Sequence, residues 1–207
     1  MKCINTFVFF CLSLLGQSVI LDAQKIEVED WEVTINNRQP IEKVIETIGL
    51  KPGMTIGEVG AGTGRITVWF ADKVGPSGMV YANDIDKASL DHLEKRCKKE
   101  GFTNVKIILG TVDDPKLPAG SLDIAFMTNT YHHLEKPVEL VHNLLPTLKE
   151  NGILAIVERD AERTGNYHEG TVRGEFIKQM DKAGFEVFKV DISMKQDNIY
   201  LARPKKQ

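Results

Sequence analysis

A glycine-rich turn is the first segment of this sequence whose residue types and spacing could do chemistry. It reads Glu58-Val59-Gly60-Ala61-Gly62-Thr63-Gly64 and closes a short apolar run that begins at Met54. Glycines at alternate positions let the backbone turn sharply and approach a ligand with no Cβ in the way. Glu58 adds a carboxylate, which attracts the ammonium of an amino-acid ligand and repels a pyrophosphate. The segment predicts a ligand-binding turn, and the alternative is an ordinary strand–helix connection.

The main alternative ligand for this turn is a dinucleotide. Its fingerprint is G-x-G-x-x-G, in which the third glycine allows close packing of helix on strand. Arg65 stands where that third glycine would fall, and Glu58 would face the pyrophosphate. Both residues disfavour a nicotinamide-dependent oxidoreductase.

Two further carboxylates follow the next apolar runs. Asp84 ends the second run, and Asp113 follows the third within Gly110-Thr111-Val112-Asp113. Ligands of parallel sheets bind at the carboxyl ends of the strands, so these acids are expected near the glycine-rich turn. A helix cap or turn is the alternative for each, and we assign Asp86 to that role. Asp113 is favoured over its neighbour Asp114.

In these residues the stretch from Gly53 to Glu158 resembles the class I S-adenosylmethionine-dependent methyltransferases, whose first motif is an acidic residue, a hydrophobic residue and G-x-G-x-G. The resemblance implies S-adenosylmethionine as cofactor. It places Asp84 on the two ribose hydroxyls, Ile85 against the adenine ring and Asp113 on the adenine amino group. The cofactor-binding residues it implies are Glu58, Gly60, Gly62, Gly64, Asp84, Ile85 and Asp113. Arg38, in Asn36-Asn37-Arg38-Gln39-Pro40, is a candidate for the cofactor's carboxylate.

The segment from Thr128 to Leu134 lies where this family places acceptor-facing residues, and it contains His132 and His133. Methyl transfer mainly needs alignment, and a base only when the acceptor is protonated. We take His132 and His133 as the catalytic candidates, the alternative being loop or cap residues. A second set, from Glu158 to Glu169, has His168 as its best candidate, against a solvated loop.

Strand-like and helix-like segments alternate from Gln39 onward, so the predicted fold class is α/β, a doubly wound, mostly parallel seven-stranded sheet with a C-terminal antiparallel hairpin strand. The predicted strands are 54–59, 79–83, 105–109, 122–127, 153–157, 185–192 and 198–202. The predicted helices are 41–48, 66–74, 87–100, 137–148 and 171–183.

The N-terminus differs from the rest of the chain. Lys2 precedes an apolar run from Phe7 to Leu15, and small residues follow at Gly16 and Ala23. This pattern predicts an export signal over residues 1–23 and a methyltransferase domain over residues 24–207. We expect an exported chain, periplasmic or secreted, if the signal functions, and a cytoplasmic one otherwise, with no stable membrane span after processing. A buried helix or an uncleaved anchor is the alternative. Of three cysteines only Cys97 lies outside this segment, and we expect it in the core.

The composition limits the partners. A formal net charge of −3 gives no electrostatic reason to expect nucleic acid, and no Asn-Pro-Pro-aromatic motif for base methylation is present. No cluster of Cys and His has metal-ligand spacing, so no metal is predicted. We expect a small-molecule methyl acceptor, with an acceptor site that is open or completed by a protein partner or a second copy. The alternative function is an exported, non-catalytic protein that keeps the cofactor cleft.

Overall fold

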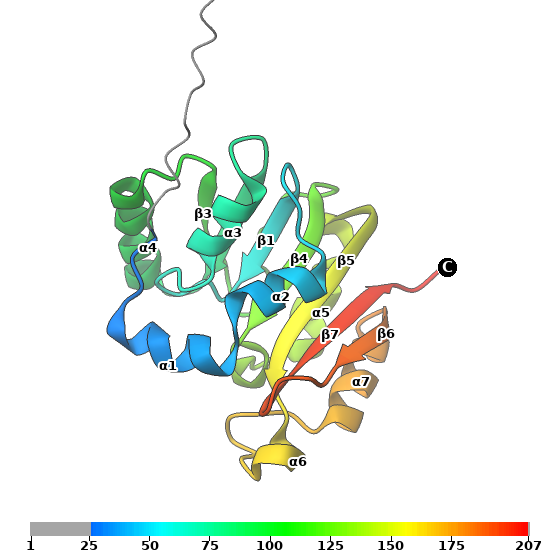
Figure 1. The fold of residues 1–207 in the computed structure, drawn as a ribbon. Helices are drawn as coiled ribbons and strands as arrows, with labels where there is room; N and C mark the ends of the chain where they lie inside the picture. The colour runs from blue at the N-terminus through cyan, green and yellow to red at the C-terminus, as the bar shows by residue number, and fades with distance from the viewer. Residues whose placement is uncertain (1–25, 207) are drawn as a thin grey trace, which may run out of the picture.

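The computed structural model describes residues 26–206 and is built around one seven-stranded sheet with the strand order β3-β2-β1-β4-β5-β7-β6 (Figure 1). The strands are β1 Thr55–Val59, β2 Met79–Asp84, β3 Val105–Leu109, β4 Leu122–Thr128, β5 Leu148–Arg159, β6 Phe185–Asp191 and β7 Asp197–Pro204. The helices are α1 Asp30–Arg38, α2 Ile41–Ile48, α3 Thr67–Val74, α4 Lys87–Glu100, α5 Pro137–His142, α6 Ala161–Thr164 and α7 Arg173–Lys182.

The strand directions confirm the predicted topology. β1 pairs in parallel with β2 and β4, β2 with β3, and β4 with β5. β7 is antiparallel to both of its neighbours, β5 and β6. The sheet is therefore parallel except for the single strand β7, as the final hairpin predicted.

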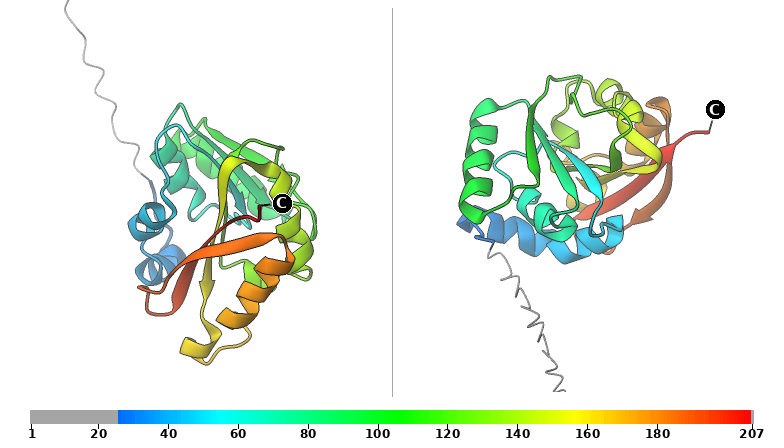
Figure 2. Two further views of the ribbon diagram at one scale, coloured as in Figure 1. Left: turned by 90° about the vertical axis from the view of Figure 1, so that its right-hand side faces the viewer. Right: turned by 90° about the horizontal axis from the view of Figure 1, so that it is seen from above.

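Helices cover both faces of the sheet, with α2, α3 and α4 on one side and α5 and α7 on the other (Figure 2). Successive residues of β4 point to opposite faces, because the side chains of a strand alternate. Phe126 packs in the cluster that contains Phe70 of α3. Met127 packs in the cluster that contains Phe176 of α7. The two layers hold the strands rigidly at the ends where a ligand would bind.

Local signals placed most helix ends correctly. Asp86 is the N-cap of α4, and its carboxylate accepts hydrogen bonds from the N–H groups of Ala88 and Ser89 at 3.0 and 3.3 Å. Gly101 closes the same helix in the left-handed conformation. Asp86 is therefore a capping residue, as predicted.

The helix predicted over 137–148 is shorter in the structure. α5 ends at His142, Leu145–Thr147 form a 3-10 turn, and β5 begins at Leu148. Pro146 carries no N–H and cannot continue an α-helix, which explains the early end. The predicted strand 153–157 is accordingly the centre of a 12-residue strand.

The first helix, α1, was not predicted. Its residues show no apolar face, and the only buried one is Glu32. Glu32 pairs with Arg96 of α4 at 2.6 Å, and Arg96 also pairs with Glu100 at 3.0 Å. Because a buried ion pair across 64 residues leaves no periodic pattern in the sequence, α1 could not be inferred from hydrophobic spacing.

The predicted export signal over residues 1–23 lies outside the described residues. Between residues 26 and 206, no helix is long and apolar enough to cross a membrane. Cys97 is buried, as expected, and desolvation raises the pKa of its thiol to about 11.

Candidate cofactor and acceptor site

A cavity of about 330 Å³ opens where β1, β2 and β4 end. The strand order reverses beside β1, since β2 lies on one side and β4 on the other, and such a switch point is where open α/β sheets bind ligands. The residues that line it lie at the ends of β1 and β2, in the connections that follow β1, β2, β3 and β4, and in α5. They are Val59, Gly60, Asn83, Asp84, Ile85, Thr111, Val112, Asn129, Thr130, His133, Leu134, Glu135 and Leu140. The chain therefore forms the crevice that the glycine-rich turn predicted.

Asp84 lies in the wall of this cavity with its carboxylate fixed by the backbone. The N–H of Gly62 donates to Oδ2 at 2.8 Å, and the N–H of Asp86 donates to Oδ1 at 2.9 Å. Each carboxylate oxygen has a second lone pair. The carboxylate is thus oriented before any ligand arrives and can still accept two neighbouring hydroxyl groups.

Two apolar side chains stand exposed in the same cavity. Ile85 is 58% exposed and Val112 is 38% exposed, although large aliphatic residues usually lie inside a protein. Ile85 follows the carboxylate of Asp84, and Val112 comes from the connection after β3. Together they offer apolar surface for a planar ring next to a hydroxyl-binding carboxylate.

The three glycines of the turn have different roles, although all have positive φ. A Cβ on Gly60 would lie 2.1 Å from Oγ1 of Thr130, and a Cβ on Gly64 would lie 2.3 Å from Cδ1 of Leu93. Gly60 and Gly64 are therefore required by packing, Gly60 also lining the cavity. Gly62 has φ of 54° and no atom within 4 Å of its would-be Cβ, so it alone faces open space.

Glu58, which was predicted to contact the cofactor, does not line the cavity. Its side chain is 1% exposed and accepts a hydrogen bond from Oγ1 of Thr67 at 2.6 Å. Burial raises the pKa of this carboxyl to about 8, against the opposing effects of Thr67 and Arg65. The acid lies under the turn and supports it.

Asp113 does not line the cavity either. Its carboxylate accepts from Oγ1 of Thr111 at 2.9 Å and pairs with Lys136 at 3.3 Å, and these two contacts lower its pKa. The residues of this connection that line the cavity are Thr111 and Val112. The turn thus directs Asp113 toward Lys136, and a contact of Asp113 with the adenine amino group stays a prediction.

His132 and His133 form a 3-10 turn with Tyr131 after β4, and their rings lie 4.1 Å apart. His133 lines the cofactor cavity. His132 lines an adjacent cavity of about 370 Å³ and its Nδ1 lies 3.0 Å from Oε1 of Glu158. Glu158 is 1% exposed and also accepts from Oγ1 of Thr171 at 2.9 Å. The two neighbouring histidines thus face two different cavities.

An amide pair between the buried Gln39 and the partly buried Asn129 was not predicted. Nε2 of Gln39 donates to Oδ1 of Asn129 at 3.0 Å, and Nδ2 of Asn129 donates back to Oε1 of Gln39 at 3.2 Å. Arg65 and Arg38 join this pair, Arg65 at Gln39 and Arg38 at Asn129. Asn129 has φ of 51°, so the pair holds a strained residue at the cavity wall. The polar run from Asn36 to Gln39 was its only signal.

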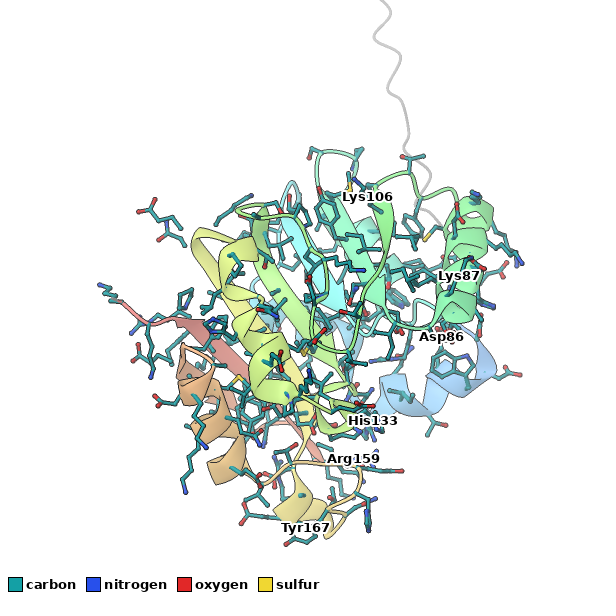
Figure 3. The ribbon with its side chains drawn as sticks, turned by 180° about the vertical axis from the view of Figure 1, so that it is seen from behind. Asp86, Lys87, Lys106, His133, Arg159 and Tyr167 are labelled. Carbon is teal, nitrogen blue, oxygen red and sulfur yellow. The ribbon has the colours of Figure 1, made fainter. Side chains whose placement is uncertain are left out.

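The candidates after β5 include Arg159 and Tyr167, which are labelled together with His133 in Figure 3. Tyr167 lines the cavity of His132, whereas His168 is exposed and lines neither cavity. Asp160 caps α6 and accepts from Arg163, Arg173 and Asn198, so it is a structural residue. Between residues 26 and 206, no three His, Cys, Asp or Glu side chains are placed to hold a metal ion.

Comparison with known proteins gives a consistent result. A family model described as a methyltransferase domain matches residues 56–152. Nocamycin O-methyltransferase of Saccharothrix syringae is 30% identical over 87 residues, which are 42% of this chain and 31% of that protein. The ubiquinone/menaquinone biosynthesis C-methyltransferase UbiE of Shewanella sediminis (strain HAW-EB3) is 27% identical over 115 residues, 55% of this chain and 46% of that protein. The match thus spans less than half the length of these curated relatives.

Solved structures match over a larger share. A SAM-dependent methyltransferase from Aquifex aeolicus aligns with a TM-score of 0.75 and 25% identity, covering 85% of this chain and 98% of that one. The trans-methyltransferase CalH, in complex with SAH, has the same fold with a TM-score of 0.61 and 23% identity, over 81% of this chain and 55% of that one. The family model and the Aquifex aeolicus structure support the class I S-adenosylmethionine-dependent methyltransferase superfamily for this chain, and S-adenosylmethionine is the cofactor of that superfamily.

Proposed function

We propose that this chain transfers the methyl group of S-adenosylmethionine to a small-molecule acceptor. The observation that carries the proposal is the preoriented carboxylate of Asp84 beside the exposed Ile85, in a cavity at the switch point of the sheet. The cofactor supplies a methyl group on a sulfonium, which is a good leaving group. The protein then needs to bind, align and exclude water rather than form covalent bonds.

The described residues fit the adenosine half of the cofactor. Asp84 would accept from the two ribose hydroxyls while its oxygens stay held by the N–H groups of Gly62 and Asp86. Ile85 and Val112, which line the cavity, would hold the adenine ring. Gly62 leaves space for close approach of the ligand to the backbone. Asn129 lines the same cavity and accepts a hydrogen bond from Arg38, and these two residues are the candidates for holding the amino-acid half.

His132 acts as general base when the acceptor carries a proton at working pH. An ionised carboxylate can only accept, so Glu158 keeps the proton of the neutral ring on Nδ1 and leaves the lone pair on Nε2. Thr171 holds Glu158 in turn. His133, on the cofactor side, positions the acceptor. Glu158 is therefore a positioning residue that acts through His132.

Two measurements test the proposal. Calorimetry with S-adenosylmethionine and S-adenosylhomocysteine on the purified chain should show binding of both, and NAD should not bind. Labelled cofactor incubated with the protein and a small-molecule extract should give labelled products. Cofactor binding without transfer into any extract would instead support a non-catalytic binding protein. Binding of NAD in place of the adenosyl cofactors would refute the assignment of the cavity.

The acceptor is a small molecule rather than nucleic acid, given the formal net charge of −3. A protein partner or a second copy would complete the acceptor site, and the extract assay repeated at high protein concentration tests this. Export over residues 1–23 remains a prediction of the sequence. Fractionation and N-terminal sequencing of the expressed chain check it, and a cytosolic chain that still begins at Met1 would contradict it.

A further inference from the structure

A second and larger cavity, of about 930 Å³, lies beside the cofactor cavity and is called the basic groove here. It runs between the α1–α2 junction and the β6–β7 connection, which Figure 1 shows at the same end of the molecule as α1. Four cationic side chains line it, and none of the lining residues is Asp or Glu. The cations are Arg38, Lys43, Arg159 and Lys195.

The acidic partners of these cations lie outside the lining. Lys43 pairs with Asp191 at 2.9 Å, and Arg38 pairs with Asp197 at 3.2 Å. Lys195 has no ion pair within residues 26–206, so the basic groove keeps an excess of positive charge.

Arg159 has unused donor capacity in the groove. Its Nη1 pairs with Glu169, whose side chain is 57% exposed, and its Nε is buried without a hydrogen-bond partner. A buried donor without an acceptor is unfavourable, and an incoming oxyanion would satisfy it. The planar guanidinium fork matches the two oxygens of a carboxylate or phosphate.

Apolar residues line the groove beside the uncharged polar residues Thr34, Asn37, Ser193 and Gln196, and these apolar residues indicate the rest of the ligand. Ile35, Pro40 and Met194 line the same groove as the four cations. An apolar wall with a cationic rim suits a molecule with an apolar body and one oxyanion group. A fully hydrophilic anion would leave these three residues without a partner surface.

The groove adjoins the cofactor cavity through one hydrogen bond. Nη2 of Arg38, which lines the groove, donates at 2.8 Å to Oδ1 of Asn129, which lines the cofactor cavity. We infer that the basic groove binds the oxyanion end of the methyl acceptor, whose other end reaches past Asn129 into the cofactor cavity, and that this acceptor is a small apolar organic acid carrying a carboxylate or phosphate. The inference rests on the proposed methyl transfer and adds the substrate class to it.

Matched probes test the inference on the full chain saturated with S-adenosylhomocysteine. Benzoate and phenyl phosphate should bind, and benzamide, which has nearly the shape of benzoate without the charge, should bind at least about 10-fold more weakly. Whichever anion binds more tightly identifies carboxylate or phosphate as the preferred group. Absence of binding by both anions, or equal binding of benzamide, overturns the inference.

Variants locate the site. Arg159→Gln should weaken binding of the anion by about 10-fold or more and leave the affinity for S-adenosylhomocysteine unchanged. Glu169→Gln should strengthen anion binding, because it removes a competing carboxylate. Arg203→Gln is the matched control, since Arg203 also pairs with an exposed acid, Glu186, but does not line the groove.

The same variants separate the failures of the two proposals. Unchanged anion binding in Arg159→Gln overturns the inference about the groove. A loss of S-adenosylhomocysteine affinity in that variant also overturns it, because the groove would then hold the cofactor's own carboxylate. A wild-type chain that does not bind S-adenosylhomocysteine refutes the proposed function instead. If the chain methylates such an acid, the methyl-labelled products formed in an extract should be retained on an anion exchanger.

Discussion

Replacing Asp84 by Asn tests the cofactor site most sharply, because the side chain keeps its size and loses its charge. Both carboxylate oxygens already accept a backbone N–H, from Gly62 and Asp86, so an amide must turn one NH₂ group toward a donor. The variant therefore loses one of the two charge-assisted hydrogen bonds to the ribose. Such a bond contributes about 1.5–3 kcal/mol, which predicts a roughly 10- to 150-fold rise in Kd.

Calorimetric titration of Asp84→Asn with S-adenosylhomocysteine measures this loss directly. Thermal melting of the same samples shows whether the fold is intact. Asp86→Ala is the matched control, because its side chain caps α4 outside the cavity while its N–H still holds Asp84. It should lower the free energy of unfolding by about 0.5–2 kcal/mol and leave Kd unchanged. An unchanged Kd in Asp84→Asn, or an equal loss in Asp86→Ala, would refute the ribose assignment.

Three further predictions follow from the geometry. Gly62→Ala and Gly49→Ala both place alanine at positive φ with open space around it, so each should lower the free energy of unfolding by about 1–2 kcal/mol. Only Gly62→Ala should also weaken cofactor binding. If the two variants bind the cofactor with equal affinity, Gly62 is a purely structural glycine. Because burial raises the pKa of Glu58 to about 8, the folded state holds a proton that the unfolded state releases above its ordinary pKa of 4.5. The contribution of Glu58 to stability should therefore fall as pH rises from about 4.5 to 8. Urea unfolding at several pH values should show this fall in the wild-type chain and not in Glu58→Gln. If the free energy of unfolding of the two proteins depends on pH in the same way, the burial argument is wrong. His132→Ala should reduce turnover by roughly 10²- to 10⁴-fold and leave cofactor affinity unchanged. His168→Ala, in an exposed loop, should change neither turnover nor cofactor affinity. A similar loss of turnover in both variants would show that His132 is not the base.

Local chemistry made much of the fold predictable from the sequence. Asp86 caps α4 and Gly101 ends it through contacts within a few residues, and both patterns are legible in the chain. α1 was missed because Glu32 is fixed by Arg96, a partner far away in the sequence. Hydrophobic periodicity carries no information about such a pair.

The candidate site shows the same division. Asp84 follows directly from its place at the end of β2. The burial of Glu58 under the turn depends on Thr67 of the next helix, and the direction of Asp113 depends on Lys136. The pair of Gln39 and Asn129 joins two loops that only the folded sheet brings together. Side-chain direction at a strand end is set by tertiary contacts, so the motif could identify loops better than atoms.

The position of β7 has a consequence for how the chain is made. β7 lies between β5 and β6, although it leaves the ribosome after both of them. Until residues 197–204 emerge, the edge of the long strand β5 has no partner and β6 has no place in the sheet. An unpaired edge is a template for pairing with other chains, so the nascent protein is exposed to aggregation until β7 is available.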